Sequence, residues 1–388
     1  MSETEVGSKS AASTTNDISR RSVIKGAVTA GMVAATGPWI VKDAFSSSGE
    51  VNILMWSDYL PKEFIADFKK ATGITINYTG IGSNEEIVNK MKATKGQGFD
   101  IISPTNNKNL VWEPLELIQP YDMKRVPIDK VNPAMAKIGR TGWNFKGKGP
   151  HWIPHIWGTE GIAWRTDKWT PEGDAPSYGD VWKEANAGKT MGRPHSMMLG
   201  AGLYMETIGA LNPGAVWKAY ESEEKMRPIW SLITEWVVAR KKNIKLFWND
   251  ADTQKNGLLN EGVIVGQTWD GPPMSLKTAG DPVMYQAPKE GSMAWVDGMA
   301  LPIGMKNTDQ VYAFIKFAYE AKNAGKAINS HGYNSPVLGA DKFASAAYKK
   351  NFADAYPGKS LANLNPWPAE APWYMDVRTE FVNKFKSA

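Results

Sequence analysis

The chain has 388 residues, of which 42% are hydrophobic and 22% charged, so it has the composition of a globular protein and the length for two domains. Its 45 Lys and Arg residues exceed its 40 Asp and Glu residues by a small, scattered margin, which argues against a nucleic-acid-binding protein. Because it contains no cysteine, disulfides, cysteine zinc sites and thiol nucleophiles are excluded.

The first 46 residues are expected to be a disordered N-terminus followed by an export signal. The chain begins with a stretch rich in Ser, Thr and Ala that lacks apolar periodicity. Arg20 and Arg21 then precede a mildly apolar run over 27–41, which is too short to predict a membrane span. Paired arginines, an apolar run and then small residues resemble a twin-arginine signal. We therefore expect cleavage after Ser46 and a periplasmic mature protein; an uncleaved membrane anchor is the alternative.

Strand and helix patterns alternate after the signal. Continuously apolar segments predict strands, and segments with one apolar face, bounded by Pro, Ser or Gly, predict helices. In chain order these are a strand over 51–56, a helix over 61–73, a strand over 74–80, a helix over 83–96 and a strand over 99–104. Such alternation predicts βαβ units and a parallel sheet.

A second α/β unit is predicted over 158–289. The later elements are a helix over 227–242, a strand over 261–269 with a turn over 270–273, a strand over 292–302 and a helix over 310–323. The whole chain is therefore expected to be of the α/β class.

Aromatic and polar side chains stand where predicted strands end. Trp56, Ser57, Asp58 and Tyr59 follow the first strand, the polar segment 103–107 follows the third, and the pair Trp269–Asp270 closes a later one. In open α/β sheets, ligands bind beyond the carboxyl ends of the strands. These side chains are thus expected to meet at one edge.

Trp295 and Asp297 are two residues apart in a predicted strand, so their side chains point to the same face. Burying an unpaired carboxylate beside a Trp is costly, which makes the pair a poor choice for a core. The pair is well suited to a cation, because the ring face and the carboxylate both attract it.

Seven segments spread over the chain carry a family resemblance: "MWSDYLPKEFIADFKKATGI", "SNEEIVNKM", "GFDIISPT", "GTEGIAW", "GQTWDG", "PKEGSMAWVDGMALP" and "HGYNSP". From about Val51 to the C-terminus, the chain resembles the spermidine/putrescine-binding proteins of bacterial ABC importers. The resemblance implies two lobes, each a mostly parallel sheet flanked by helices, with a ligand cleft between them. We expect lobe 1 over 47–157 and 290–329, and lobe 2 over 158–289 and 330–388.

The resemblance also implies which residues bind. The family's cation box corresponds here to Trp56, Ser57, Asp58, Tyr59, Trp269, Trp295, Asp297 and Tyr333, with Asp270 beside it and the family's hydroxyl contact near Thr105 and Asn106. A carboxylate would hold an ammonium, and aromatic faces would line its methylene chain. Closure of the cleft would exclude water and strengthen each contact.

One region departs from the family. Where the family places acids at the start of a second-lobe helix, this chain has Ser196 and Leu199, preceded by Arg193 and His195. A helix beginning near Ser196 would present free N–H groups and the positive end of its dipole, which suits an anion. Two ligand classes stay open: a zwitterion, or a diamine held by acids elsewhere in the cleft.

The sequence thus predicts a periplasmic solute-binding protein, a monomer that traps a small amine by hinge closure and delivers it to an ABC permease in the inner membrane. No cofactor, metal or nucleic acid is expected. The alternatives are a zwitterion carrier, a secreted enzyme on this fold, or a protein that presents its ligand to a sensor. No recognisable nucleophile–base pair supports the enzyme.

Overall fold

The computed structural model describes residues 49–388, so the predicted signal lies outside the described residues. The strands are β1 (Glu50–Trp56), β2 (Thr75–Ile81), β3 (Ile101–Ile102), β4 (Ile118–Gln119), β5 (Trp152–Arg165), β6 (Thr190–Gly192), β7 (Ile244–Phe247), β8 (Val265–Trp269), β9 (Val283–Gln286), β10 (Met293–Pro302) and β11 (Asn365–Pro366). The helices are α1 (Lys62–Thr72), α2 (Asn84–Thr94), α3 (Asn109–Trp112), α4 (Pro133–Thr141), α5 (Pro194–Thr207), α6 (Ala215–Lys218), α7 (Glu223–Val238), α8 (Ala251–Leu259), α9 (Gly271–Ala279), α10 (Thr308–Ala318), α11 (Ala321–His331), α12 (Ala346–Ala355) and α13 (Pro372–Ser387).

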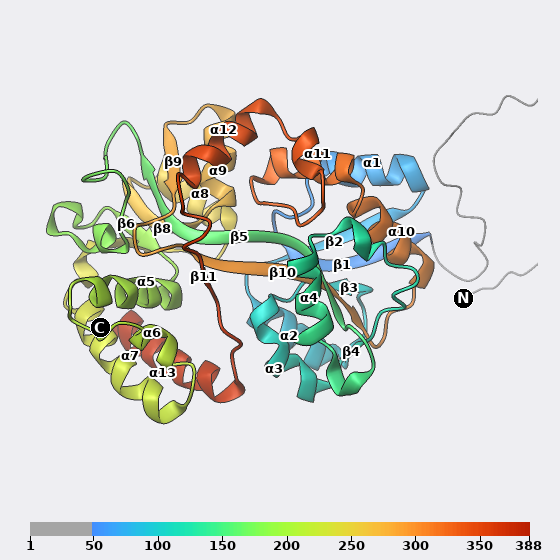
Figure 1. The fold of residues 1–388 in the computed structure, drawn as a ribbon, viewed down its shortest axis with the longest axis horizontal. Coiled ribbons are helices and arrows are strands. Elements are labelled where there is room, and N and C mark those ends of the chain that lie inside the picture. Colours follow the sequence, from blue (N-terminus) through green and yellow to red (C-terminus); the bar gives the residue numbers. More distant parts are fainter. Residues whose placement is uncertain (1–48) are drawn as a thin grey trace, which may run out of the picture. The chain divides into compact units, whose positions relative to one another are not determined.

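The strands form one mixed sheet in the order β2-β1-β3-β10-β5-β8-β6-β7, with β4 and β11 on β10 and β9 on β5. Pairing is parallel at both ends, where β1 lies between β2 and β3, and β6 between β7 and β8. The two long strands β5 and β10 join these ends and are antiparallel to each other. Figure 1 shows them running between two groups of helices. The two-lobed α/β class is confirmed, and the antiparallel pair is the part that alternation alone did not predict.

Local sequence explains the first elements. Phe64 and Phe68 stand one turn apart and bury the inner face of α1, and Gly73 ends the helix in the left-handed conformation. Ser83 caps α2 by accepting a hydrogen bond from the backbone N–H of Glu86, as the capping-box spacing predicts.

Two predicted helices have different bounds in the structure. The helix predicted over 227–242 is α7 and begins at Glu223, because the Ser222 hydroxyl caps it by accepting from the Lys225 N–H. The helix predicted over 310–323 is broken into α10 and α11. Tyr319 donates from its buried hydroxyl to the Pro154 carbonyl, and Glu320 takes an extended conformation that starts the second helix.

Two apolar clusters support the sheet. One packs β1, β3 and β10 against α1 and α10, with Phe68, Phe314 and Met299 among its buried members. The other packs α5 and α7 against α13, with Trp230 and Phe385 in its centre. The strands that carry the candidate site therefore rest on a rigid base.

Candidate functional site

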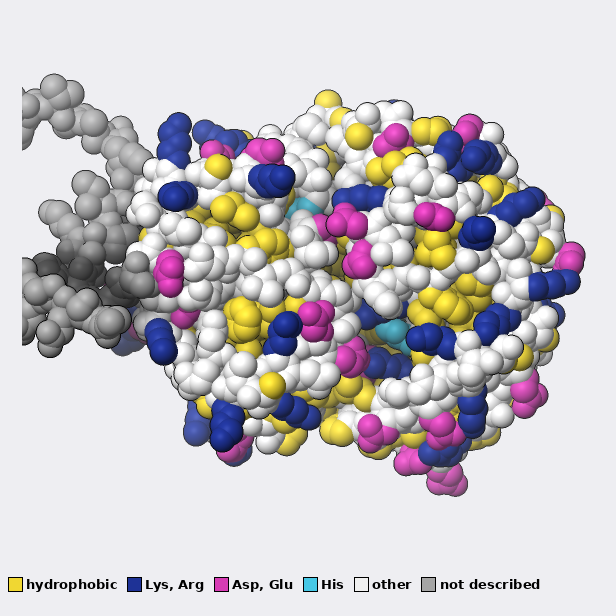
Figure 2. Space-filling view, turned by 180° about the vertical axis from the view of Figure 1, so that it is seen from behind, with side chains coloured by type: hydrophobic (Ala, Val, Ile, Leu, Met, Phe, Trp, Pro, Cys, Tyr) yellow, Lys and Arg dark blue, Asp and Glu magenta, His cyan; other side chains and the backbone are white. Residues whose placement is uncertain are grey.

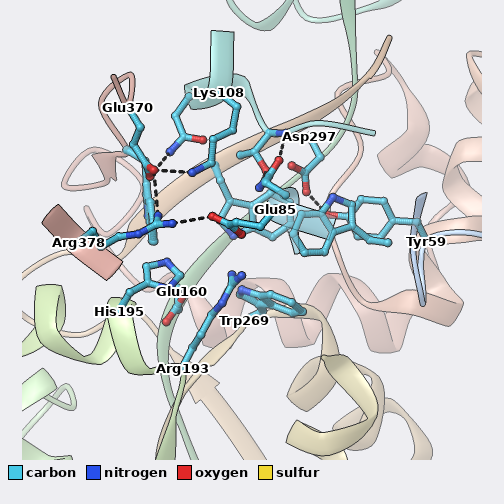
Figure 3. Close-up of a pocket in the computed structure, with 16 residues that line it drawn as sticks. Tyr59, Glu85, Lys108, Glu160, Arg193, His195, Trp269, Asp297, Glu370 and Arg378 are labelled. Atoms are coloured by element: carbon cyan, nitrogen blue, oxygen red, sulfur yellow. Dashed lines mark hydrogen bonds and ion pairs between the residues drawn. The ribbon is translucent and has the colours of Figure 1, made fainter. Parts of the chain in front are cut away.

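A pocket with a volume of about 50 Å³ lies where β1, β8 and β10 meet the start of α5 and the segment before α13 (Figure 3). Its lining residues are Trp56, Tyr59, Asn84, Glu85, Thr105, Asn107, Lys108, Glu160, Arg193, His195, Trp269, Trp295, Asp297, Trp367, Glu370 and Arg378. One end is mainly aromatic and the other is mainly ionic. In the space-filling view, Lys, Arg and His side chains show in a hollow of the surface (Figure 2).

The aromatic end is built from residues at strand termini. Trp56 closes β1 and Trp269 closes β8, and their rings meet edge to face with centroids 5.6 Å apart. Tyr59 is stacked against Trp295 at 6.4 Å. The Trp56 indole N–H donates to the Ser103 carbonyl at 3.1 Å, which fixes its ring. Flat apolar walls of this kind suit a methylene chain or a cation.

Asp297 lines the same pocket, two residues after Trp295 on β10. The β10–β5 register shifts between Asp297 and Gly298, and such a bulge re-aims the side chain beside it. The Tyr59 hydroxyl donates to the Asp297 carboxylate. Burial raises the pKa of Asp297 to about 7, although hydrogen bonds from Thr105 and Tyr59 work against the rise. A buried carboxyl with such a pKa would be stabilised in its ionised form by an ammonium.

The ionic end contains a buried cluster that sequence reasoning missed. Glu370 accepts from Lys108 at 2.5 Å and from the Arg378 guanidinium at 2.9 Å, and Arg378 also donates to Glu85 at 2.6 Å. The Asn107 amide adds a hydrogen bond to Glu370 at 3.0 Å. Burial alone would raise the pKa of Glu85, but Arg378 and the other nearby cations lower it overall, so this carboxylate is ionised.

Arg193, His195 and Glu160 lie between the two ends. The Arg193 guanidinium carbon is 5.7 Å from the centre of the Trp269 ring. Burial lowers the pKa of His195 well below its usual value, and Arg193 lowers it further, so the imidazole is neutral. Glu160 is buried on β5, where it accepts from the Gln267 amide at 2.8 Å, and burial raises its pKa.

The start of α5 is close to its predicted place. The helix begins at Pro194, two residues before the expected Ser196, because proline favours the first helical position. Arg193 is its N-cap residue and makes no capping hydrogen bond with its side chain. The N-cap side chain therefore does not satisfy the free backbone N–H groups of this first turn.

Eight of the fourteen predicted binding residues line the pocket: Trp56, Tyr59, Thr105, Arg193, His195, Trp269, Trp295 and Asp297. The other six do not. Ser57 is exposed, and Asp58 lies behind the aromatic wall, where it faces the hydroxyl of the buried Tyr333. Burial raises the pKa of Asp58 to about 6, while Lys255 and Tyr333 lower it.

The remaining three predicted binding residues make hydrogen bonds within the fold. Asn106 accepts from the Val296 N–H at 3.0 Å and holds β10 in place. Ser196 is buried within the first turn of α5 and donates to the Arg193 carbonyl. The Asp270 carboxylate accepts from Asn334 at 2.9 Å and from Tyr356 at 2.7 Å, so it is engaged away from the pocket.

Within residues 49–388, no group of His, Asp and Glu side chains is arranged to hold a metal ion. None of the helices in the same range has the length and apolar character to cross a membrane.

Comparisons with known proteins agree with this architecture. Residues 63–354 match the family model of the bacterial extracellular solute-binding proteins. The spermidine/putrescine-binding periplasmic protein of Salmonella typhimurium is 24% identical over 374 residues, which cover 95% of this chain and 98% of that protein. The putrescine-binding periplasmic protein of Escherichia coli is 25% identical over 349 residues, covering 87% and 91% of the two chains. A putative spermidine/putrescine ABC transporter structure from Listeria monocytogenes has a TM-score of 0.70 at 21% identity, covering 87% of this chain and 99% of that one.

Proposed function

Because the chain belongs to the bacterial extracellular solute-binding protein family, we propose that it is the solute-binding protein of an ABC importer and binds a small amine, either a polyamine or a related molecule. The observation that carries the proposal is Asp297, a buried carboxyl that lines the pocket together with the rings of Tyr59, Trp269 and Trp295. An ammonium beside Asp297 would receive a counter-ion, and the Trp269 and Trp295 faces would cover its methylene chain. Trp56 and Tyr59 would close over it.

Binding is proposed to close two lobes, 47–157 with 290–329 and 158–289 with 330–388, about connections near Trp157, Glu290 and Ser330. The backbone of Trp157 exchanges hydrogen bonds with Asn334 at 2.9 and 3.0 Å, so two of these connections lie side by side. In this scheme the Lys108–Glu370–Arg378–Glu85 cluster joins the lobes in the closed state. A ligand that contacts both lobes would favour that state.

The proposed role as a solute-binding protein also implies where the protein acts and which partner receives its ligand. The protein would be exported by its twin-arginine-type signal, act in the periplasm as a monomer and deliver its ligand to an ABC permease. It would release the ligand chemically unchanged, which separates it from a secreted enzyme. Mass spectrometry of the ligand recovered after incubation tests this point.

A thermal-shift screen of the full chain, dialysed free of solutes, tests the proposal. The panel contains putrescine, cadaverine, spermidine, ω-amino acids and betaines. A ligand at a hundredfold over its Kd stabilises the folded state by about 2.7 kcal/mol, which is easily seen. We expect at least one amine to raise the unfolding midpoint, and Asp297→Asn to abolish the rise.

Asp167→Asn is the matched control, because Asp167 is an exposed carboxylate paired with Arg165 and does not line the pocket. It should leave the shift unchanged. If no amine stabilises the protein, or if Asp297→Asn responds like the wild type, the proposal is wrong.

A further inference from the structure

Arg193 is the pocket cation whose charge has no paired carboxylate. Lys108 and Arg378 both form ion pairs with Glu370. Within residues 49–388, the Arg193 guanidinium makes neither a hydrogen bond nor an ion pair, and its nearest defined contact is the Trp269 ring at 5.7 Å. Figure 3 shows it pointing into the pocket between His195 and Trp269.

Such an arrangement leaves the guanidinium of Arg193 available to an anionic group of a ligand. A guanidinium carries five N–H donors in a planar fork, and because Arg193 is half-buried in the pocket lining, these donors are left for water or a ligand. The nearby carboxylates do not meet this need. Glu85 is held by Arg378, and Glu160 accepts from Gln267.

The charges of the pocket divide between its two ends. At the ionic end, the cations Lys108 and Arg378 are balanced by the paired carboxylates Glu85 and Glu370, so Arg193, which lies between the two ends, is the pocket cation outside these ion pairs. The N-terminus of the 14-residue helix α5 adds a positive dipole end. Glu160 accepts a hydrogen bond from the Gln267 amide, and no ion pair joins it to Arg193 in the described part of the chain. The aromatic end carries the opposite sign, with Asp297.

We infer that the ligand is a zwitterion of the ω-amino acid class, with its ammonium at Asp297 and its carboxylate at Arg193. This inference rests on the proposed function and narrows its ligand. A carboxylate fits the planar guanidinium fork with two parallel hydrogen bonds. A second ammonium, as in a diamine, would instead be placed beside an unpaired guanidinium, where the two like charges repel.

Isothermal titration calorimetry with two ligands of equal chain length tests the inference. Cadaverine and 5-aminopentanoate share one ammonium and differ at the other end. We expect the wild-type chain to bind 5-aminopentanoate more tightly. Because charge-assisted hydrogen bonds are strong, Arg193→Gln should weaken 5-aminopentanoate binding by about 100-fold. The same change should leave cadaverine binding unchanged or improved, and Arg193→Lys should restore part of the lost affinity.

The matched control is Arg240→Gln, which removes an arginine stacked 3.9 Å from the Trp236 ring, outside the pocket. It should not affect either ligand. Tighter binding of cadaverine by the wild-type chain, with no effect of Arg193→Gln, would overturn the inference and leave the proposed function intact. If neither ligand nor any other amine binds, the proposed function itself is wrong. If a variant fails to fold, the wild-type affinities for cadaverine and 5-aminopentanoate still test the inference.

Discussion

The affinity for an amine ligand should rise about tenfold between pH 6 and pH 8. Asp297 has a pKa raised to about 7 in the ligand-free protein, mainly by burial. With that value about one tenth of the protein has an ionised Asp297 at pH 6 and about nine tenths at pH 8. An ammonium binds the ionised form, while the amine itself stays protonated throughout this range, since such groups have a pKa near 10. Binding at pH 7 should therefore release about half a proton.

Calorimetric titrations in two buffers of different ionisation enthalpy measure both the affinity and the proton release. Asp297→Asn should bind weakly and show no pH dependence from this group. Tyr59→Phe should move the midpoint to higher pH, because the Tyr59 hydroxyl donates to Asp297 and lowers its pKa. An affinity independent of pH in the wild type, with no proton released, would refute the assignment of Asp297 as the counter-ion.

Two further changes have defined expectations. Glu370→Ala removes the shared acceptor of two buried cations, so the free energy of unfolding in denaturant titrations should fall by about 3–5 kcal/mol; a change under about 1 kcal/mol would mean that the cluster is not buried in solution. Gly158→Ala would place a methyl group 2.5 Å from the Trp295 ring. It should lower the free energy of unfolding by about 1–3 kcal/mol in thermal unfolding, and it should also weaken amine binding measured by calorimetry. Gly161→Ala, on the same strand but next to Tyr285, should reduce stability alone, and equal losses of affinity in the two variants would contradict the role of Trp295.

The aromatic end of the pocket could be predicted from the sequence because its residues follow local rules. Trp56 and Trp269 stand at strand termini, and the two-residue spacing of Trp295 and Asp297 puts them on one face. Asp58 and Asp270 follow strands in the same way, but other contacts direct them elsewhere. Asp58 turns behind the wall toward Tyr333, and Asp270 caps α9.

The ionic end could not be predicted, because its contacts join distant parts of the chain. Lys108 and Glu370 are 262 residues apart, and Glu370 lies in an irregular segment between β11 and α13 with no periodicity. Its position depends on how α13 packs against α7, which is set by the second apolar cluster. The sequence singles out Arg193 only because it stands just before the positions at which the family has acidic residues.

The central place of β10 has a consequence for how the chain is made. β3 pairs with β10 through Ile102 and Ala300, and β4 pairs with it through Gln119 and Leu301, so the partners are far apart in the sequence. A nascent chain that has left the ribosome as far as α9 therefore still lacks the strand that joins the two ends of its sheet. Contacts so far apart slow folding, and until β10 arrives the apolar edge of β3 is open to other chains. Chaperones should accordingly bind ribosome-held fragments that stop before residue 293 and release fragments that extend past 302.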